Sequence, residues 1–359
     1  MRFHILGLPH TVTSKEYNAC AYTQKVWKFG KMMKARGHEI IHYGHEDSDV
    51  ICDEHVTVIN NEVWKECYGH YDWRKTTFKY NVDDVAYRTF ISNASVEIGK
   101  RKQKNDFLLP FWGYGHKAIC DAHNDMIVVE PGIGYGSTCQ RWRVYESYHM
   151  RSAAGGLKQV NECNQDNYEV VIPNYFDAED FEYSETKDDY ILYLGRVYTG
   201  KGVDIAVEVA KHTGKKLIIA GQGTLAQMGY TNIPSNITEV GYADAELRKQ
   251  LMSRAQALFI ASKYGEPFGG VQVEAWLSGT PVISPDYAAF AEMNRHNITG
   301  FRCRTFKDYV EAVENVQYLL PIQSRKHGER YLLENIAPEF ERYFQDVTNI
   351  YTGKGWYTI

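Results

Sequence analysis

The stretch YILYLG at residues 190–195 opens the pattern that decides the fold. Apolar residues suited to a buried strand end at a glycine, and residues 202–212 then carry apolar side chains at helical spacing. Further strands are predicted at residues 216–220, 237–240, 257–260 and 281–284, and further helices at residues 245–254 and 271–277. Strands that alternate with helices at this spacing indicate βαβ units, and therefore a parallel sheet covered on both faces.

The first half of the chain repeats this alternation with longer interruptions. Strands are predicted at residues 3–7, 39–43, 107–111 and 126–129, and helices at residues 23–35 and 82–100. Residues 46–80 are polar and aromatic and receive no assignment. The acidic stretch 177–189 predicts a hinge between two domains, because domain boundaries fall in exposed polar linkers. Apolar residues at helical spacing predict a last helix within residues 338–351.

The composition is that of an ordinary globular protein. A chain of 359 residues exceeds the roughly 150 of one domain, so two domains are expected. The net charge is −5 and the basic run at residues 100–104 is short, so a nucleic-acid partner is not expected. No transmembrane segment and no signal peptide are expected, which leaves peripheral contact with a membrane open. Seven cysteines without a CxxC pair predict a reduced, cytoplasmic protein.

Two cations lie in the turn after the strand at residues 190–194. Gly195, Lys201 and the residues between them have the glycine and lysine spacing of a phosphate-binding loop. Gly202 stands where such a loop needs a Ser or Thr hydroxyl for Mg²⁺, so an NTPase is not expected. An anion is still favoured there, because a helix begins at this turn and Arg196 adds a second positive charge.

Two further glycine turns resemble a dinucleotide-binding fingerprint. Gly221 and Gly223 follow a strand, but residues 229–236 interrupt any helix behind them after about one turn. That fingerprint needs a full helix whose N-terminus points at the pyrophosphate. The loop at residues 132–136 has Ser137 where the third glycine belongs. An oxidoreductase is therefore not expected.

Two carboxylates, Glu266 and Glu274, lie eight residues apart on either side of a strand-to-helix loop. Between them, the amides of Phe268, Gly269, Gly270 and Val271 precede the helix and suit hydroxyl groups or an oxyanion. A structural alternative is that acidic residues simply favour the N-terminal half of a helix.

This motif, Glu266-x₇-Glu274 in an E-P-F-G context, resembles the signature of retaining glycosyltransferases of family four. The resemblance covers roughly residues 170–305 and includes the glycine turns described above. It implies the α/β GT-B fold, in which two Rossmann-like domains face each other across a cleft. The implied parts are an acceptor-side domain at residues 1–173, a nucleotide-sugar-binding domain at residues 174–335, and a helix at residues 336–359 that crosses back to the N-terminal domain.

The resemblance also implies roles for individual residues. Arg196 and Lys201 would bind the donor diphosphate and stabilise the charge on the leaving group. Glu274 would accept the ribose hydroxyls, and Glu266 with the Phe268–Val271 amides would hold the sugar. Gly223 and Tyr242 complete the implied donor site.

No metal and no cofactor are implied. Preorganised cations and a helix N-terminus stabilise a departing diphosphate without one. Asp47 and Asp49 form a DxD pattern, which the other major transferase fold uses to bind a metal. They lie in a polar loop and are interpreted as solvated charges.

The N-terminal domain departs from the family pattern at the expected catalytic centre. The family often has a histidine at the end of a middle strand, whereas the strand at residues 126–129 is followed by Glu130. Glu130 is therefore predicted to face the anomeric carbon, unless it caps a helix or pairs with Arg141 or Arg143. His116 and His123 are alternatives for that position, and His10 in the first loop is a candidate contact to the donor sugar or phosphate.

The implied reaction transfers a sugar from a nucleotide-diphosphate sugar to a hydroxyl of a carbohydrate, lipid or other acceptor. The anomeric configuration is retained and no metal takes part. The alternatives on the same fold are a nucleotide-sugar epimerase or hydrolase, or a non-catalytic sugar-binding relative.

Overall fold

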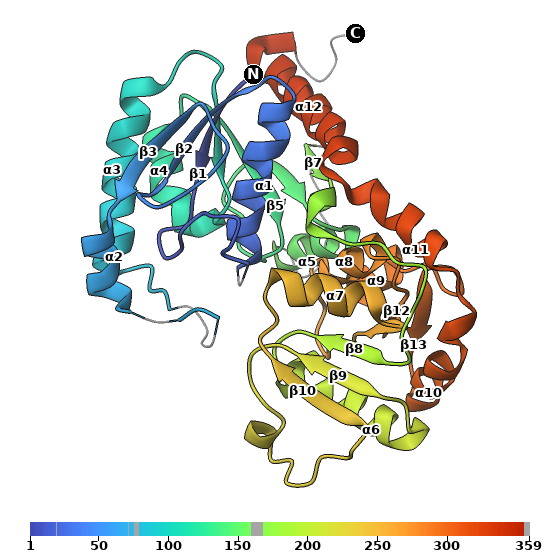
Figure 1. Cartoon of the computed structure of the whole chain (residues 1–359). Helices are drawn as coiled ribbons and strands as arrows, with labels where there is room; N and C mark the ends of the chain where they lie inside the picture. The colour runs from blue at the N-terminus through green and yellow to red at the C-terminus, as the bar shows by residue number, and fades with distance from the viewer. Residues whose placement is uncertain (19, 71, 75–78, 159–167, 355–359) are drawn as a thin grey trace. The chain divides into compact units, whose positions relative to one another are not determined.

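The computed structural model describes the chain except residues 19, 71, 75–78, 159–167 and 355–359. Its contacts divide the chain into two compact units (Figure 1). Unit 1 consists of Met1–Tyr175 together with Leu333–Ile359, and unit 2 consists of Phe176–Leu332. Unit 2 is thus inserted in the sequence of unit 1.

Unit 1 contains a seven-stranded parallel sheet with the order β3-β2-β1-β4-β5-β6-β7. The strands are β1 (Arg2–Leu6), β2 (Glu39–His45), β3 (Glu54–Ile59), β4 (Phe107–Pro110), β5 (Ile127–Ile133), β6 (Trp142–Tyr145) and β7 (Glu169–Val171). Alternate side chains point to opposite faces, so Phe3 and Ile5 enter one core while Leu6 enters the other. Both faces therefore need helices to cover them.

Helices cover both faces of this sheet. α1 (Ala21–Ala35) and α12 (Leu333–Asn349) lie side by side on one face (Figure 1). α2 (Asn61–Tyr68), α3 (Val85–Arg101) and α4 (Lys117–Ala122) pack on the other, and α5 (Tyr148–Lys158) follows β6. α12 is held by a buried stripe at helical spacing that includes Phe340, Phe344 and Val347.

Unit 2 contains a six-stranded parallel sheet with the order β10-β9-β8-β11-β12-β13. The strands are β8 (Ile191–Leu194), β9 (Leu217–Ala220), β10 (Ile237–Gly241), β11 (Ala257–Phe259), β12 (Val282–Pro285) and β13 (Gly300–Cys303). One face carries α6 (Val203–Thr213) and α10 (Phe306–Asn315). The other carries α7 (Ala245–Arg254), α8 (Val271–Leu277) and α9 (Ala288–Met293), and α11 (Pro321–Gly328) packs on α8.

The parallel sheets and the helices predicted at residues 245–254 and 271–277 are confirmed. The end predicted for the middle strand, at residue 129 just before Glu130, is wrong, because β5 spans Ile127–Ile133 and includes Glu130. Pro131 and Gly132 suggested a strand end, but the register of β5 with β6 shifts between Glu130 and Ile133. Such an irregularity accommodates a proline, which lacks the N–H that a regular ladder needs.

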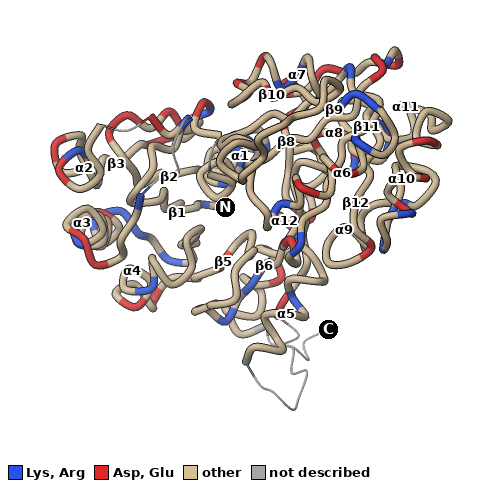
Figure 2. The backbone as a smooth tube through the Cα atoms, turned by 90° about the horizontal axis from the view of Figure 1, so that it is seen from below, with Lys and Arg blue, Asp and Glu red and all other residues tan. Residues whose placement is uncertain are grey.

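Charged residues of both signs are interspersed along the described chain of each unit (Figure 2). Of the helices that the structure describes, none has both the length and the apolar sequence needed to cross a bilayer.

The two sheets share one topology. Numbered along the chain within each unit, the strands run 3-2-1-4-5-6, with a seventh added in unit 1. The order reverses between β1 and β4 in unit 1 and between β8 and β11 in unit 2. In doubly wound sheets, ligands bind outside the carboxyl ends of the strands at this switch point. The topology therefore predicts ligand sites at four loops. Two of them follow β1 and β4 in unit 1, and two follow β8 and β11 in unit 2.

Candidate functional site

The loops that follow β8 and β11 meet at the switch point of unit 2. The amide of Lys263 donates to the carbonyl of Gly200 at 2.9 Å. Gly202 has a φ of +69°, and a Cβ there would lie 1.9 Å from the carbonyl oxygen of Ala261. Only glycine permits this backbone contact, because a side chain would displace one of the two loops.

A largely buried ion pair joins these two loops. The ammonium of Lys201 donates to Oε1 of Glu266, and the hydroxyl of Ser262 donates to the same oxygen at 2.7 Å. The side chain of Lys201 is 24% exposed and that of Glu266 is 11% exposed. Burial and the Glu266 carboxylate raise the pKa of Tyr264, whose ring centroid lies 5.1 Å from the Lys201 ammonium. The Glu266 carboxylate is therefore held in one orientation beside a cation.

Arg196 supplies the second positive charge of this site. It is exposed on the loop after β8, and its guanidinium carbon lies 5.5 Å from the ring centroid of Tyr198. The hydroxyl of Tyr193 donates to the Arg196 carbonyl at 2.7 Å, which fixes the main chain of the loop. Two cations thus follow the central strand of unit 2, as the sequence placed them.

Glu274 lies in the first turn of α8 and is engaged by a cation from α7. The guanidinium of Arg248 donates to Oε2 of Glu274. The Glu274 charge is the main cause that raises the pKa of Arg248. Arg248 and Ser262 are not among the site residues predicted from the sequence. No local pattern could reveal Arg248, because its contact joins residues 26 apart on two different helices.

The remaining residues predicted to bind a donor lie at the same edge of the sheet. Gly223 follows β9 and Tyr242 follows β10, while residues 268–271 connect β11 to α8. The Phe268 ring is buried, 6.3 Å from Phe176, so this residue can offer a ligand only its main chain. Together with the charged residues above, the donor-binding residues predicted in unit 2 gather outside the carboxyl ends of β8 to β11.

Glu130 of unit 1 is buried within β5, and both of its carboxylate oxygens accept hydrogen bonds from the loop that follows this strand. Its Oε1 accepts the Tyr135 hydroxyl at 2.7 Å, and its Oε2 accepts the amides of Cys139 at 3.0 Å and Gln140 at 3.1 Å. Burial raises the pKa of the carboxyl group. Arg143 forms its ion pair with Glu169 instead. The Glu130 carboxylate thus fastens the loop that follows β5.

We expect Glu130→Gln to lower the melting temperature while turnover per folded molecule stays within a few-fold of wild type. A neutral amide replaces charge-assisted hydrogen bonds to the loop, which costs about 1–2 kcal/mol. Tyr135→Phe removes one of the three hydrogen bonds and is the matched control, with a smaller effect. Thermal unfolding and initial rates on the same samples measure both quantities. A loss of turnover of about 100-fold at an unchanged melting temperature would place Glu130 at the reacting centre instead.

His10 and His116 lie at the switch point of unit 1, on the loops after β1 and β4. Both are buried, and burial lowers the pKa of each to about 3. His10 Nδ1 lies 2.8 Å from the Tyr87 hydroxyl, and His116 stacks on Phe90. Both rings are therefore neutral near pH 7 and can offer hydrogen bonds but no positive charge. His123 follows α4 and contacts the Ser95 carbonyl at 2.9 Å.

The DxD residues are engaged in local structure. Asp49 accepts the Trp27 indole N–H at 2.8 Å, and Asp47 accepts the Asn61 amide at 2.8 Å. Within the described part of the chain, no group of three or more His, Cys, Asp or Glu side chains is placed to hold a metal ion.

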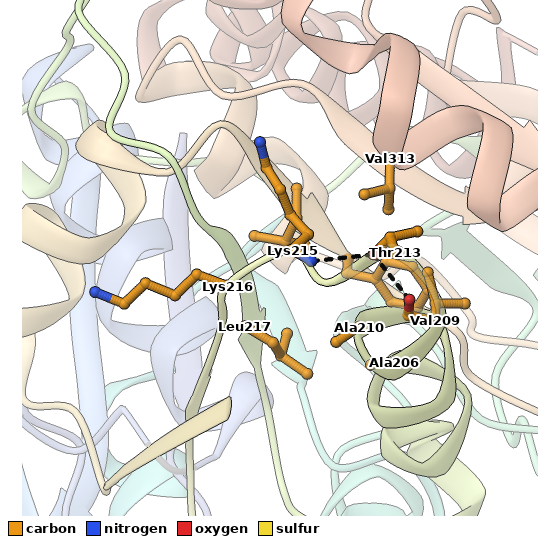
Figure 3. A pocket seen from close by; sticks show the side chains of 10 residues that line it. Ala206, Val209, Ala210, Thr213, Lys215, Lys216, Leu217 and Val313 are labelled. Atoms are coloured by element: carbon orange, nitrogen blue, oxygen red, sulfur yellow. Dashed lines mark hydrogen bonds between the residues drawn. The ribbon is translucent and has the colours of Figure 1, made fainter. Parts of the chain in front are cut away.

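A small hollow beneath the C-terminal end of α6 is not a ligand site (Figure 3). Its volume is about 10 Å³, which is room for one water molecule. Ile191 and Leu217, which begin β8 and β9, line it. It therefore lies at the amino edge of the sheet, opposite the charged loops.

Comparison with known proteins finds sequence similarity to glycosyltransferases. Residues 176–330 match the family model described as glycosyl transferases group 1. An uncharacterized glycosyltransferase of Methanocaldococcus jannaschii is 29% identical over 170 residues, which are 42% of this chain and 43% of that protein. The chain thus aligns with less than half the length of this curated relative.

Solved structures resemble the whole chain. AviGT4, a glycosyltransferase involved in avilamycin A biosynthesis, has a TM-score of 0.71 at 17% identity, covering 98% of each chain. HepE of Anabaena, solved in complex with UDP and glucose, has a TM-score of 0.69 at 12% identity, covering 96% of this chain and all of that one. The predicted fold class is confirmed: two parallel-sheet α/β domains of the GT-B type.

Proposed function

We propose that this protein is a glycosyltransferase that moves a sugar from a nucleotide-diphosphate sugar to an acceptor hydroxyl. The observation that carries the proposal is the Lys201–Glu266 ion pair at the switch point of unit 2. A ligand is expected at that point of the sheet, and the pair lies within the residues that match the glycosyltransferase model. Unit 2 would bind the donor and unit 1 the acceptor.

The charges of the site suit a departing diphosphate. An ammonium group has three N–H donors, so Lys201 can keep its bond to Glu266 and still donate to phosphate oxygens. Arg196 on the same loop adds a guanidinium fork that matches phosphate geometry. Charge develops on the phosphate as the sugar–oxygen bond breaks, and fixed cations stabilise it without a metal. We therefore propose a metal-independent reaction.

The carboxylates would hold the rest of the donor. Arg248 donates to Glu274, and Ser262 and Lys201 donate to Glu266. With these partners in place, Glu274 would accept the ribose hydroxyls and Glu266 the sugar hydroxyls. Gly223, Tyr242 and the Phe268–Val271 amides would line the same donor. We propose retention of the anomeric configuration because the Glu266-x₇-Glu274 motif resembles that of retaining glycosyltransferases.

Binding of nucleoside diphosphates in excess chelator tests the proposal. We expect one of UDP, GDP or ADP to raise the melting temperature in EDTA, since a ligand at 100 times its dissociation constant adds about 2.7 kcal/mol. The matching nucleotide sugar should then release diphosphate only when an acceptor is present, which separates a transferase from a hydrolase or an epimerase. No stabilisation by any nucleoside diphosphate, or activity that needs Mn²⁺, would contradict the proposal.

Substitutions of Glu274 and Glu266 should have different effects, one on nucleotide binding and the other on turnover. Glu274→Gln is expected to weaken nucleoside diphosphate binding about tenfold, because ribose contacts are made equally in the ground state and the transition state. Glu266→Gln is expected to leave that binding unchanged and to lower turnover, because its sugar contacts matter most while the ring distorts. Calorimetry with nucleoside diphosphate and initial rates measure the two effects. The reverse pattern would mean that the roles are exchanged.

A further inference from the structure

The acidic stretch at residues 177–189 is fastened to the ends of two helices of unit 2. The amide of Asp188 donates to the carbonyl of Arg254, the last residue of α7, at 2.7 Å. The amide of Ser184 donates to the carbonyl of Ser278, which directly follows α8, at 3.4 Å. The segment therefore lies across the C-terminal ends of both α7 and α8.

Lys187 of this segment joins the two helices through its ammonium group. Its Nζ atom donates to the carbonyl of Ser253, in the last turn of α7, at 2.7 Å and to the carbonyl of Ser278 at 3.1 Å. It also donates to the hydroxyl of Thr280 at 3.0 Å. That hydroxyl gives its own proton to the carbonyl of Met252 in α7. All three donors of the ammonium are thus used, and its positive charge lies where two helix dipoles end.

The pair that we assign to the donor ribose bridges the same two helices, which contact each other in unit 2 (Figure 1). Arg248 of α7 lies five residues before Ser253, and Glu274 of α8 lies four residues before Ser278. A helix has about 3.6 residues per turn, so this bridge lies roughly one turn from the Lys187 contacts on both helices. The helices are therefore joined twice, once by Lys187 and once by Arg248 with Glu274.

Hydrogen bonds within α8 link the Lys187 contact to Glu274. The amide and the hydroxyl of Ser278 both donate to the carbonyl of Glu274, at 3.2 Å and 3.0 Å. The carbonyl of the same serine accepts the Lys187 ammonium. A shift of this end of α8 away from α7 would therefore also move Glu274 away from the Arg248 guanidinium that donates to it.

We propose that Lys187 is a positioning residue for the donor nucleotide. It joins the ends of α7 and α8 and thereby keeps Arg248 in contact with Glu274, whose carboxylate would accept the ribose hydroxyls. The inference rests on the proposed function. It extends the donor site to a residue that lies roughly one helix turn from those that would touch the nucleotide.

Nucleoside diphosphate binding by the full chain tests the inference. Calorimetry uses whichever of UDP, GDP and ADP stabilises the wild type. It is done at pH 6, because burial lowers the pKa of Lys187 to about 7 and the three bonds need the ammonium form. Lys187→Met is expected to weaken binding about three- to fivefold and to leave turnover at saturating donor unchanged, because ribose contacts are equal in the ground state and the transition state. Lys187→Arg keeps a charge and N–H donors and should retain most of the affinity.

Lys215→Met is the matched control. Lys215 also bonds the acidic segment, through Asp189, but it precedes β9 and belongs to neither α7 nor α8. This variant should bind the nucleotide like the wild type. In a Glu274→Gln background, Lys187→Met should cause no further loss, because its effect passes through Glu274. If Lys187→Met does not fold, Lys187→Gln, which keeps N–H donors without the charge, takes its place in the same comparisons.

Three results would overturn the inference: unchanged affinity in Lys187→Met, an equal loss of affinity in Lys215→Met, or a loss that adds in full to that of Glu274→Gln. Each of them requires a wild type that binds the nucleotide, so the proposed function would stand. If the wild type binds no nucleoside diphosphate, the proposed function fails and this inference fails with it.

Discussion

Lys201→Ala is expected to lower turnover by about 100-fold or more. The substitution removes the ammonium that bonds to Glu266 and that we assign to the donor diphosphate. The loss should fall mainly on turnover, because the phosphate charge that Lys201 stabilises grows as the leaving group departs; deleting one such donor typically costs 10²–10³-fold. Arg196→Ala should act in the same direction. Steady-state rates at saturating donor measure the effect.

Lys211→Ala is the matched control for this loss of charge. Lys211 lies near the C-terminal end of α6, the helix that follows the Lys201 loop. It pairs with Glu208 on the exposed side of the helix at 2.7 Å. An exposed ion pair of this kind contributes little to stability, and its removal should leave turnover unchanged. Near-normal turnover in both Lys201→Ala and Arg196→Ala would show that other residues bind the diphosphate.

Gly202→Ala is expected to destabilise unit 2 by about 2–5 kcal/mol. Part of this cost is the left-handed backbone at a φ of +69°, which disfavours alanine by about 1–2 kcal/mol. The rest comes from the new methyl group, which would lie 1.9 Å from the Ala261 carbonyl oxygen and force the two loops apart, at about 1–3 kcal/mol. Turnover should fall as well, since Lys201 and Glu266 lie on those loops.

The opposite end of α6 supplies the control. Gly214 has nearly the same backbone, with a φ of +68°, but nothing lies within 4 Å of a Cβ placed there. Gly214→Ala therefore measures the backbone cost alone, and the difference between the two variants measures the loop contact. Urea unfolding, followed by a probe in unit 2, gives both free energies. Equal destabilisation would mean that the loops are not in contact through Gly202.

The central strands and the helices that pack on them could be predicted from the sequence, but the edge elements β3 and α2 could not. Helix α7 is predicted by its sequence, because Asp244 caps it and its apolar residues repeat at helical spacing. In contrast, β3 is the edge strand of unit 1 and its pattern alternates only weakly, while α2 fully buries Tyr68 alone among its residues. Elements that bury little leave little hydrophobic pattern in the sequence. Residues 46–80, which include both elements, therefore carry no pattern that predicts them.

The site residues also fall into two groups. Those recognisable from their local sequence could be predicted, whereas their partners from distant parts of the sequence could not. Arg196, Lys201 and Glu266 could be predicted because each lies in the loop that directly follows a strand. The partners that orient them could not, since Arg248 reaches Glu274 from another helix. Glu130 is a third case: its position beside a strand was visible, but its bonds to the Cys139 and Gln140 amides depend on how the following loop returns.

Unit 1 is completed by α12, which follows all of unit 2 in the sequence, and this fixes the order in which the two units can be completed during synthesis. Phe344 of α12 packs 4.8 Å from Phe3 and 4.9 Å from Phe107, on the face of the sheet that the first strands present. All of unit 2 is translated before this helix emerges, so the inserted unit can close its core first. Until then, the aromatic side chains that α12 covers beside α1, Phe3 and Phe107, lack this cover. A chain released after residue 332 would keep that face exposed permanently.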